Sequence, residues 1–386
     1  MGVSKLFTEF FESEKASGIV LILCTLASLF LANSAFQESY GHIWHYQIGY
    51  HSVEHWINDG LMTIFFLLIG LELEREVYIG ELSKLKNALL PVIAALGGML
   101  VPAGIYMIFN YGTPTQSGAG IPMATDIAFA LGVLSLLGSR VPTSLKVFLT
   151  ALAVIDDLGA ILVIALFYTD NLSLLNLGIA LAIMGVLFIL NRMKVNNWIP
   201  YAIGGIGMWY FMLNSGIHAT ISGVLLAFVI PFGDGSEKTI SYKLQHLLHK
   251  PVAFLILPIF ALANTAIIIS DNWMEGLKHE NSIGIFLGLV AGKPLGILLF
   301  CFLAVALGLC QLPKGLKWKH IFATGFMAGI GFTMSIFITL LAFKSQPEAI
   351  TISKISIMIS SLVAGIIGYV FLNRTLKNVE ISEEEL

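Results

Sequence analysis

Long apolar segments recur along the whole chain, and each is long enough to cross a lipid bilayer as a helix. A membrane-spanning helix needs about 20 mostly apolar residues. The segments are continuous rather than alternating in polarity, which favours helices over β-barrel strands. We therefore expect an all-α polytopic membrane protein with twelve spans, near residues 15–34, 55–78, 88–110, 117–137, 143–168, 172–191, 197–213, 216–230, 251–269, 282–309, 319–343 and 351–373.

Charged residues are scarce and are placed unevenly between the loops. Only 12% of the 386 residues are charged, against about 25% in soluble domains. With a cytoplasmic N-terminus, most of the lysines and arginines fall on the cytoplasmic side, and the opposite side has only Lys278, Lys344 and Lys354. Cytoplasmic loops normally carry this excess, so both termini are predicted to be cytoplasmic. We expect one membrane domain over residues 1–386, and the net charge of −3 indicates no nucleic-acid partner.

Four ionisable residues lie deep within the predicted spans: Asp126, Asp156, Asp157 and Lys293. A charged side chain at the bilayer centre costs about 2.5–3.5 kcal/mol on insertion scales, so such residues usually belong to functional sites. A second group of charges closes the second span on its cytoplasmic side, where side chains commonly extend to the headgroups; it consists of Glu72, Glu74, Arg75 and Glu76.

Helix-breaking residues accompany two of the deep charges. Asp126 follows Gly120 and Pro122, and Lys293 directly precedes Pro294, whose ring leaves a carbonyl group without its helical partner. Broken backbone at membrane depth is tolerated only inside the protein or beside a water-filled cavity. These patterns predict an ion-accessible site within the membrane.

A short internal similarity links the fourth and eleventh predicted spans. The segment "AGIPMATDIAF" (119–129) is similar to "AGIGFTMSIF" (328–337), and the two would run in opposite directions across the membrane. Paired interrupted segments mark the binding site in transporters built from inverted repeats. We predict such repeats over about 88–168 and 282–373, with chance recurrence of small and apolar residues as the alternative.

Three carboxylates and one ammonium group in a partly dry cavity are suited to exchanging protons for a cation. A hard cation such as Na⁺ prefers oxygen ligands, which Asp126, Asp157 and Thr125 could supply together with carbonyl groups of broken helices. Successive side chains on a helix point about 100° apart, so Asp156 and Asp157 cannot serve one site equivalently. One of them is expected to face the cation and the other to face Lys293.

Six segments resemble the signatures of NhaA-type sodium-proton antiporters: "AVIDDLGAI", "MATDIAFALGVL", "GLVAGKPLGI", "GIGFTMSIFI", "FFLLIGLELERE" and "LNSGIHATISGVLLAF". The resemblance extends over essentially the whole chain. It implies a bacterial inner-membrane protein whose interrupted fourth and eleventh helices cross. It also implies electrogenic, pH-regulated exchange of Na⁺ or Li⁺ for protons by alternating access, for sodium and pH homeostasis, with no enzymatic activity and no cofactor.

The resemblance implies a role for each deep residue. Asp157 would be the principal cation ligand, and Asp156 would be the ion-pair partner of Lys293. Asp126 and Thr125 would belong to the interrupted fourth helix, where Asp126 balances the helix ends and assists binding. A pH-sensing cytoplasmic mouth would comprise Glu72, Arg75, Glu76, Gln245, His246 and His249, and His218 falls at a position linked to the pH profile.

Two residues of the mouth depart from the family pattern. Glu74 stands where a lysine is familiar, and Gln245 stands where a glutamate is familiar. Because these charges set the local concentrations of protons and cations, we expect a shifted pH range. His246 and His249 could alternatively form a metal site, but no third ligand lies near them in the sequence.

Three further interpretations remain open or disfavoured. Residues 34–53 are rich in aromatics and glycine, which fits either an interfacial aromatic belt or a β-hairpin that pairs with a second copy in a homodimer. An intramembrane aspartyl protease is disfavoured, since adjacent aspartates on one helix are poorly placed to activate one water. The stronger alternative is another secondary transporter on the same fold, such as a sodium-coupled organic-anion carrier with Lys293 as anion contact.

Overall fold

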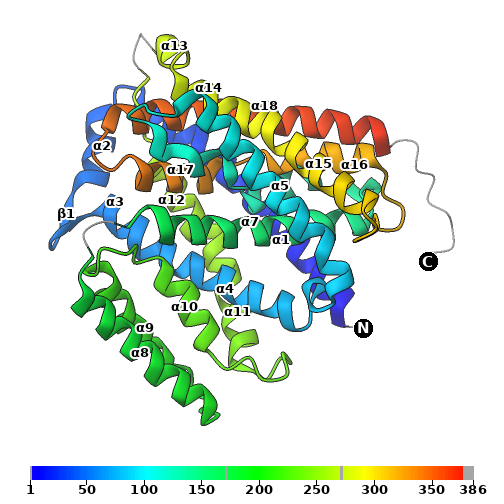
Figure 1. Ribbon diagram of the computed structural model, residues 1–386. Helices are drawn as coiled ribbons and strands as arrows, with labels where there is room; N and C mark the ends of the chain where they lie inside the picture. Colours follow the sequence, from blue (N-terminus) through cyan, green and yellow to red (C-terminus); the bar gives the residue numbers. More distant parts are fainter. Residues whose placement is uncertain (1, 170–171, 270–272, 377–386) are drawn as a thin grey trace. The chain divides into compact units, whose positions relative to one another are not determined.

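The computed structural model describes residues 2–169, 172–269 and 273–376, and its regular elements are almost all helices (Figure 1). Within these residues, nine helices are long and apolar enough to cross a membrane, or ten when one bent pair counts as a span. The expectation of a mostly helical, multi-pass membrane protein is confirmed. The count of twelve spans stays a prediction.

The chain divides into two compact units that alternate along the sequence. Unit 1 consists of Met1–Ile19, Lys84–Asp156 and Asp271–Leu386, and unit 2 consists of Val20–Ser83 and Asp157–Ser270. Two helices continue from one unit into the other, α1 (Gly2–Ala32) and α7 (Thr143–Phe167). Most of both predicted repeats falls within unit 1.

Unit 1 contains the backbone of three of the four deep charges. Its further elements, in which η marks a 3-10 or π helix, are α5 (Leu85–Asn110), η3 (Gln116–Met123), α6 (Ile127–Ser135), η4 (Gly138–Arg140), α13 (Trp273–Gly276), α14 (Glu280–Leu287), η6 (Gly288–Gly292), α15 (Lys293–Ala306), α16 (Trp318–Ala328), α17 (Phe332–Ala342) and α18 (Pro347–Leu376).

Two glycines bring the backbones of α5 and α15 into contact. A Cβ atom on Gly97 would lie 2.3 Å from the carbonyl oxygen of Gly296, and one on Gly296 would lie 2.2 Å from that of Gly97. Only glycine fits at both positions without a shift of the helices. Helix α15 runs along α5 in Figure 1, and its first residue is Lys293, so this close packing also places the lysine.

The fourth and eleventh predicted spans are both interrupted. Between η3 and α6 the backbone is extended at Ala124 and Asp126, and α16 and α17 are bent by 50° at their junction. The element η3 packs against α17, and α6 packs against α16. The amide of Asp126 donates a 2.7 Å hydrogen bond to the carbonyl of Ile330, so the two interruptions lie side by side.

The helix around Lys293 is widened rather than broken. A π helix, η6, ends directly before Lys293, and the apolar span continues without interruption over Glu280–Ala306. The expectation of broken backbone at Lys293 is therefore wrong. A single widened turn leaves room for Pro294, which cannot donate to the helix, while the helix axis continues.

Unit 2 carries the charges that close the second predicted span. Its further elements are α2 (Gln37–His45), β1 (Gln47–Ile48), β2 (His51–Ser52), α3 (Val53–His55), η1 (Trp56–Leu61), α4 (Met62–Tyr78), η2 (Glu81–Ser83), α8 (Leu174–Arg192), α9 (Trp198–Leu213), α10 (Ile221–Val229), α11 (Ile240–Pro251), η5 (Val252–Ile256) and α12 (Leu257–Asn264). Helix α4 packs against α10, and a Cβ atom on Gly223 would lie 2.2 Å from the Thr63 carbonyl oxygen.

Two of the predicted spans correspond to short helices. Helices α9 and α10 have 16 and 9 residues, less than the roughly 20 that a bilayer requires. The segment between them forms turns, and α10 begins only at Ile221. These two helices account for the difference between the twelve predicted spans and the ten helical segments of sufficient length among the described residues.

A β-hairpin lies between the first two predicted spans. Strands β1 and β2 pair in antiparallel register, with Gln47 opposite Ser52 and Ile48 opposite His51. A hairpin therefore occurs within residues 34–53 but covers only Gln47–Ser52, whereas Gln37–His45 forms the helix α2. Its use in a dimer stays a prediction.

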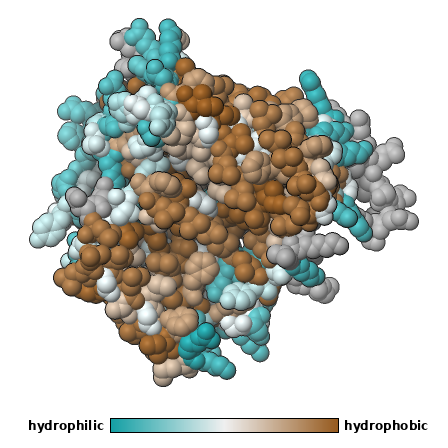
Figure 2. Space-filling model, in the orientation of Figure 1, coloured by the Kyte–Doolittle hydropathy of each residue, from teal (hydrophilic) through white to brown (hydrophobic). Residues whose placement is uncertain are grey.

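Apolar side chains dominate the visible surface of the molecule (Figure 2). On α8 and α9, which lie side by side in Figure 1, the side chains of Leu174, Leu175, Ile203 and Ile206 are exposed. Soluble proteins rarely expose continuous apolar surfaces of this kind. Contact with lipid hydrocarbon accounts for them.

Candidate functional site

A buried ion pair lies beside the interruption of the fourth span. The ammonium group of Lys293 is 2.6 Å from Oδ2 of Asp156, and both side chains are fully enclosed. Lys293 also donates to the hydroxyl of Thr125, and that hydroxyl lies 2.7 Å from the same Asp156 oxygen. Loss of either charged partner would leave the other charge buried and uncompensated, which costs about 3–5 kcal/mol.

The hydroxyl of Thr125 has a choice of acceptor. It lies 2.7 Å from Oδ2 of Asp156 and 2.8 Å from the carbonyl oxygen of Ala328. A hydroxyl carries one proton and can donate to only one of them at a time. Thr125 therefore connects the Asp156 carboxylate to the last residue of α16, at the interruption of the eleventh span.

One oxygen of Asp156 retains unused acceptor capacity. Among the described residues, Oδ1 of Asp156 has no hydrogen-bond donor, although the residue is buried. Buried polar atoms are normally hydrogen-bonded, and an exception calls for an explanation such as a functional role. A buried carboxylate oxygen with no protein donor is suited to binding a proton or a hard cation.

Both carboxylate oxygens of Asp126, in contrast, accept hydrogen bonds. Its Oδ1 accepts a 2.9 Å hydrogen bond from the amide of Phe129, and its Oδ2 accepts from the amide and the hydroxyl of Thr333, at 3.0 and 2.5 Å. The carboxylate thus caps the N-terminus of its own helix, α6, and lies at the first turn of α17. Helix N-termini carry partial positive charge and stabilise a carboxylate.

Asp157 is fully buried in α7, next to Asp156 in the chain. The division into compact units falls between the two aspartates, with Asp157 as the first residue of a segment of unit 2. Its role as principal cation ligand stays a prediction. No group of three or more His, Cys, Asp or Glu residues arranged for a resident metal occurs in the part of the chain that the structure describes.

In unit 2, α4 and α11 bring together most of the predicted cytoplasmic mouth. His249 Nδ1 lies 3.8 Å from a carboxylate oxygen of Glu72, and Arg75 donates to the side-chain oxygen of Gln245 at 3.4 Å. The guanidinium group of Arg75 also lies over the ring of Tyr242, which stacks with His246. These contacts form an array of exchangeable charges and hydrogen bonds, and Glu76 lies one residue beyond Arg75 on α4.

His218 lies elsewhere in unit 2. It is buried in the turn before α10, and its Nε2 is 3.0 Å from the carbonyl oxygen of Tyr168. A link between His218 and the pH profile stays a prediction.

Three further ionisable residues are buried, although the sequence analysis did not predict it. Glu74 is 5% exposed, so its interpretation as an extended helix-end charge is wrong, and Lys354 lies inside α18 rather than in an outer loop. His320 is fully buried near the start of α16 and accepts a 3.2 Å hydrogen bond from the Lys317 amide. Their positions within predicted spans were visible in the sequence, but the direction of each side chain was not.

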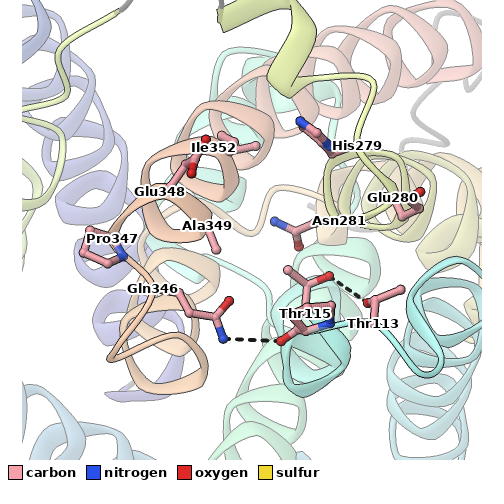
Figure 3. A pocket seen from close by; sticks show the side chains of 11 residues that line it. Thr113, Thr115, His279, Glu280, Asn281, Gln346, Pro347, Glu348, Ala349 and Ile352 are labelled. Carbon is pink, nitrogen blue, oxygen red and sulfur yellow. Dashed lines mark hydrogen bonds between the residues drawn. The ribbon is translucent and has the colours of Figure 1, made fainter.

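A separate pocket of about 490 Å³ opens in unit 1 (Figure 3). Its wall includes Glu280 and Glu348, and Asn281 points into it. Asn281 is hydrogen-bonded to the hydroxyls of Tyr106 and Ser353. None of the deep charges lines this pocket, so it is distinct from the ion-pair site.

Comparisons with known proteins agree with this geometry. The family described as Na+/H+ antiporter 1 matches residues 8–372. The chain is 65% identical to the Na(+)/H(+) antiporter NhaA of Flavobacterium psychrophilum over the full length of both proteins, and 50% identical to that of Vibrio campbellii over 97% of each. A solved sodium proton antiporter from Methanocaldococcus jannaschii has a similar fold, with a TM-score of 0.51, 16% identity and coverage of 98% and 97%.

Proposed function

The chain belongs to the Na+/H+ antiporter 1 family, and we propose that it exchanges cytoplasmic Na⁺ or Li⁺ for external protons by alternating access. It would do so in the bacterial inner membrane, with both termini in the cytoplasm, in the service of sodium and pH homeostasis. The cargo ions are its partners together with the lipid bilayer, and no cofactor is required.

The observation that carries this proposal is the state of Asp156. One of its oxygens binds Lys293 and Thr125, while among the described residues the other has no donor. A proton or a cation that arrives at the carboxylate competes with the ammonium group for the same negative charge. Binding of cargo thereby weakens the ion pair, which couples occupancy of the site to its conformation.

The four deep residues divide the work in this proposal. Asp157 is the principal cation ligand, and Asp156 alternates between Lys293 and the cargo. Thr125 adds a hydroxyl ligand, and Asp126 assists by balancing the helix ends from its capped position. If Asp157 and the Asp156 pair both lose protons when one cation binds, more than one proton moves per cation and the exchange is electrogenic.

The arrangement of the two interrupted spans supports a transporter built from inverted repeats. The pairings η3 with α17 and α6 with α16, and the contact between the interruptions, are those expected of two antiparallel segments that cross. We propose that they cross at mid-membrane among twelve spans. A movement of either segment would alter the surroundings of Thr125 and Asp126.

The array on α4 and α11 is proposed to regulate exchange by pH. Contacts such as Glu72 with His249 and Arg75 with Gln245 change strength when histidines gain or lose protons. Gln245 preserves the hydrogen bond to Arg75 but carries no charge. The pH range is therefore expected to differ from that of relatives with a glutamate at this position.

Everted membrane vesicles provide the test of the function. Addition of Na⁺ or Li⁺ to vesicles with an imposed pH gradient should collapse the gradient when the wild-type chain is present. Asp157→Asn should abolish the response, because it removes the principal ligand charge. Asp234→Asn changes an exposed loop aspartate and is the matched control, with an unchanged response.

The absence of any Na⁺ or Li⁺ response in wild-type vesicles that contain the folded protein would contradict the antiporter function. A sodium-coupled organic-anion carrier would instead accumulate an anion with Na⁺. That alternative is disfavoured by the engagement of the Lys293 ammonium with Asp156 and Thr125, which leaves it poorly suited as an anion contact.

A further inference from the structure

The N-terminus of α17 cannot cap itself. Its N-cap residue is Gly331, which has no side chain to accept hydrogen bonds from the first turn. A side chain at this position would also be obstructed, because a Cβ atom on Gly331 would lie 2.2 Å from the hydroxyl oxygen of Ser335. The amides of the first turn must therefore find acceptors on other segments.

Two distant residues supply these acceptors. The amide of Phe332 donates to the hydroxyl of Ser361 on α18 at 3.2 Å, and the amide of Thr333 donates to Asp126 at 3.0 Å. Asp126 already caps α6 through the amide of Phe129. A single carboxylate thus joins the second halves of both interrupted spans.

Thr333 contacts this carboxylate twice, through its backbone amide and through its hydroxyl, which donates to the same oxygen at 2.5 Å. Both side chains are 2% exposed, so water does not substitute readily for the hydroxyl. Without the hydroxyl, Asp126 Oδ2 would retain only the amide bond, and the carboxylate would be held less firmly against α17.

The position of Asp126 matters because it is next to Thr125 in the chain. Thr125 contacts Asp156 and Lys293 on one side and the carbonyl of Ala328 on the other. A carboxylate that fixes the backbone at residue 126 therefore fixes the hydroxyl of Thr125 relative to the ion pair.

We propose that Thr333 is a positioning residue for the ion site: its hydroxyl and amide hold the Asp126 carboxylate, and through it Thr125, against the interruption of the eleventh span. This proposal rests on the proposed antiport function. Thr333 does not touch the cargo, and it acts by keeping the oxygen ligands in place for cation binding.

The test compares hydroxyl-free and hydroxyl-bearing variants of Thr333 in proteoliposomes. Thr333→Val and Thr333→Ala should each raise the apparent KM for Na⁺ about tenfold, since a hydrogen bond to a charged group is lost, with a much smaller change in kcat. Thr333→Ser should restore the wild-type KM. The pH at half-maximal exchange should be displaced in the two hydroxyl-free variants and restored in Thr333→Ser.

Thr339→Val is the matched control on the same helix. Thr339 is fully buried, and its hydroxyl donates to the carbonyl of Ser335 within α17 rather than to the ion site. Its KM for Na⁺ should remain at the wild-type value. Thermal unfolding of each purified variant identifies those that are folded. If Thr333→Val is not folded, the conclusion rests on Thr333→Ala.

The outcomes separate the two proposals. A wild-type protein that shows no exchange contradicts the antiport function itself. A wild-type protein that exchanges, with hydroxyl-free variants of unchanged KM and pH profile, overturns the role of Thr333 alone. A Thr333→Ser variant as impaired as Thr333→Val also overturns it, because the hydroxyl would then not be the determinant.

Discussion

Asp126 and Asp156 are both buried carboxylates in unit 1, yet their negative charges are balanced by different kinds of partner. Asp126 is held by two backbone amides and a hydroxyl, which are parts of the fold and do not titrate. Asp156 is held by a lysine and a threonine side chain, and among the described residues one of its oxygens has no donor. The first arrangement suits a fixed anchor, and the second suits a charge that changes partner during transport.

The largest expected effect concerns the exchangeable partner. Lys293→Ala should lower the free energy of unfolding by about 3–5 kcal/mol, because Asp156 would remain buried without a compensating charge. Thermal unfolding of the purified protein in detergent measures the loss. If stability, transport and its pH profile were all unchanged, the ion pair would have no role in either folding or coupling.

The double variant Lys293→Gln with Asp156→Asn is the matched control for that experiment. It removes both charges and leaves groups that can still form a hydrogen bond, so most of the lost stability should return. Exchange should be abolished, since the carboxylate that alternates between Lys293 and the cargo is missing, although Asp157 remains. A double variant less stable than Lys293→Ala would argue against the pair as the cause.

A smaller effect is expected at the fixed anchor. Asp126→Asn keeps one acceptor oxygen but turns an amide NH₂ toward a donor, so stability should fall by about 1–3 kcal/mol. Exchange should be reduced but not abolished, because Asp126 does not change partner in the proposed cycle. Transport in proteoliposomes and thermal unfolding test both parts, and complete loss of exchange in a stable variant would show that Asp126 binds the cargo directly.

The smallest effect is expected outside the ion site. Gln245→Glu should convert the hydrogen bond to Arg75 into an ion pair, which is worth about 0–1 kcal/mol at a partly exposed position. The maximal rate should remain, and the pH profile should move to higher pH, since an added negative charge attracts protons to the mouth. A pH titration of exchange in vesicles provides the measurement, and Glu237→Gln in the neighbouring loop is a control.

The sequence showed how deep a charged residue lies along its span, but it did not show in which direction the side chain points around the helix axis. Asp126, Asp156, Asp157 and Lys293 stood out because each interrupts a long apolar run. Glu74 lies among the charges that end the second span, and only the fold shows that its side chain is buried. Thr333 lies in the segment that is similar to the fourth span, but the residue itself was not singled out, because a threonine in an apolar span is ordinary and its partner lies far away in the chain.

The internal similarity between the fourth and eleventh spans correctly indicated that both spans are interrupted. It did not indicate which residues of the two spans correspond. It aligns Ala119 with Ala328, whereas the N-caps Asp126 and Gly331 differ from that alignment by about one helical turn. The expectation of a broken helix at Lys293 was wrong for a related reason. Pro294 forbids one hydrogen bond, but it does not decide whether the helix ends or widens.

The sequence by itself determined that the protein lies in a membrane, that it is helical, and which charged residues lie deep within the spans. Apolar runs of bilayer length, and charges that interrupt them, are local properties of the chain. Only the tertiary structure decided how those charges are partnered. Both oxygens of Asp126 accept hydrogen bonds, whereas among the described residues only one oxygen of Asp156 does. In each case a partner comes from a residue more than a hundred positions away in the chain. Such long-range contacts depend on how the helices pack against one another, which no single stretch of sequence encodes.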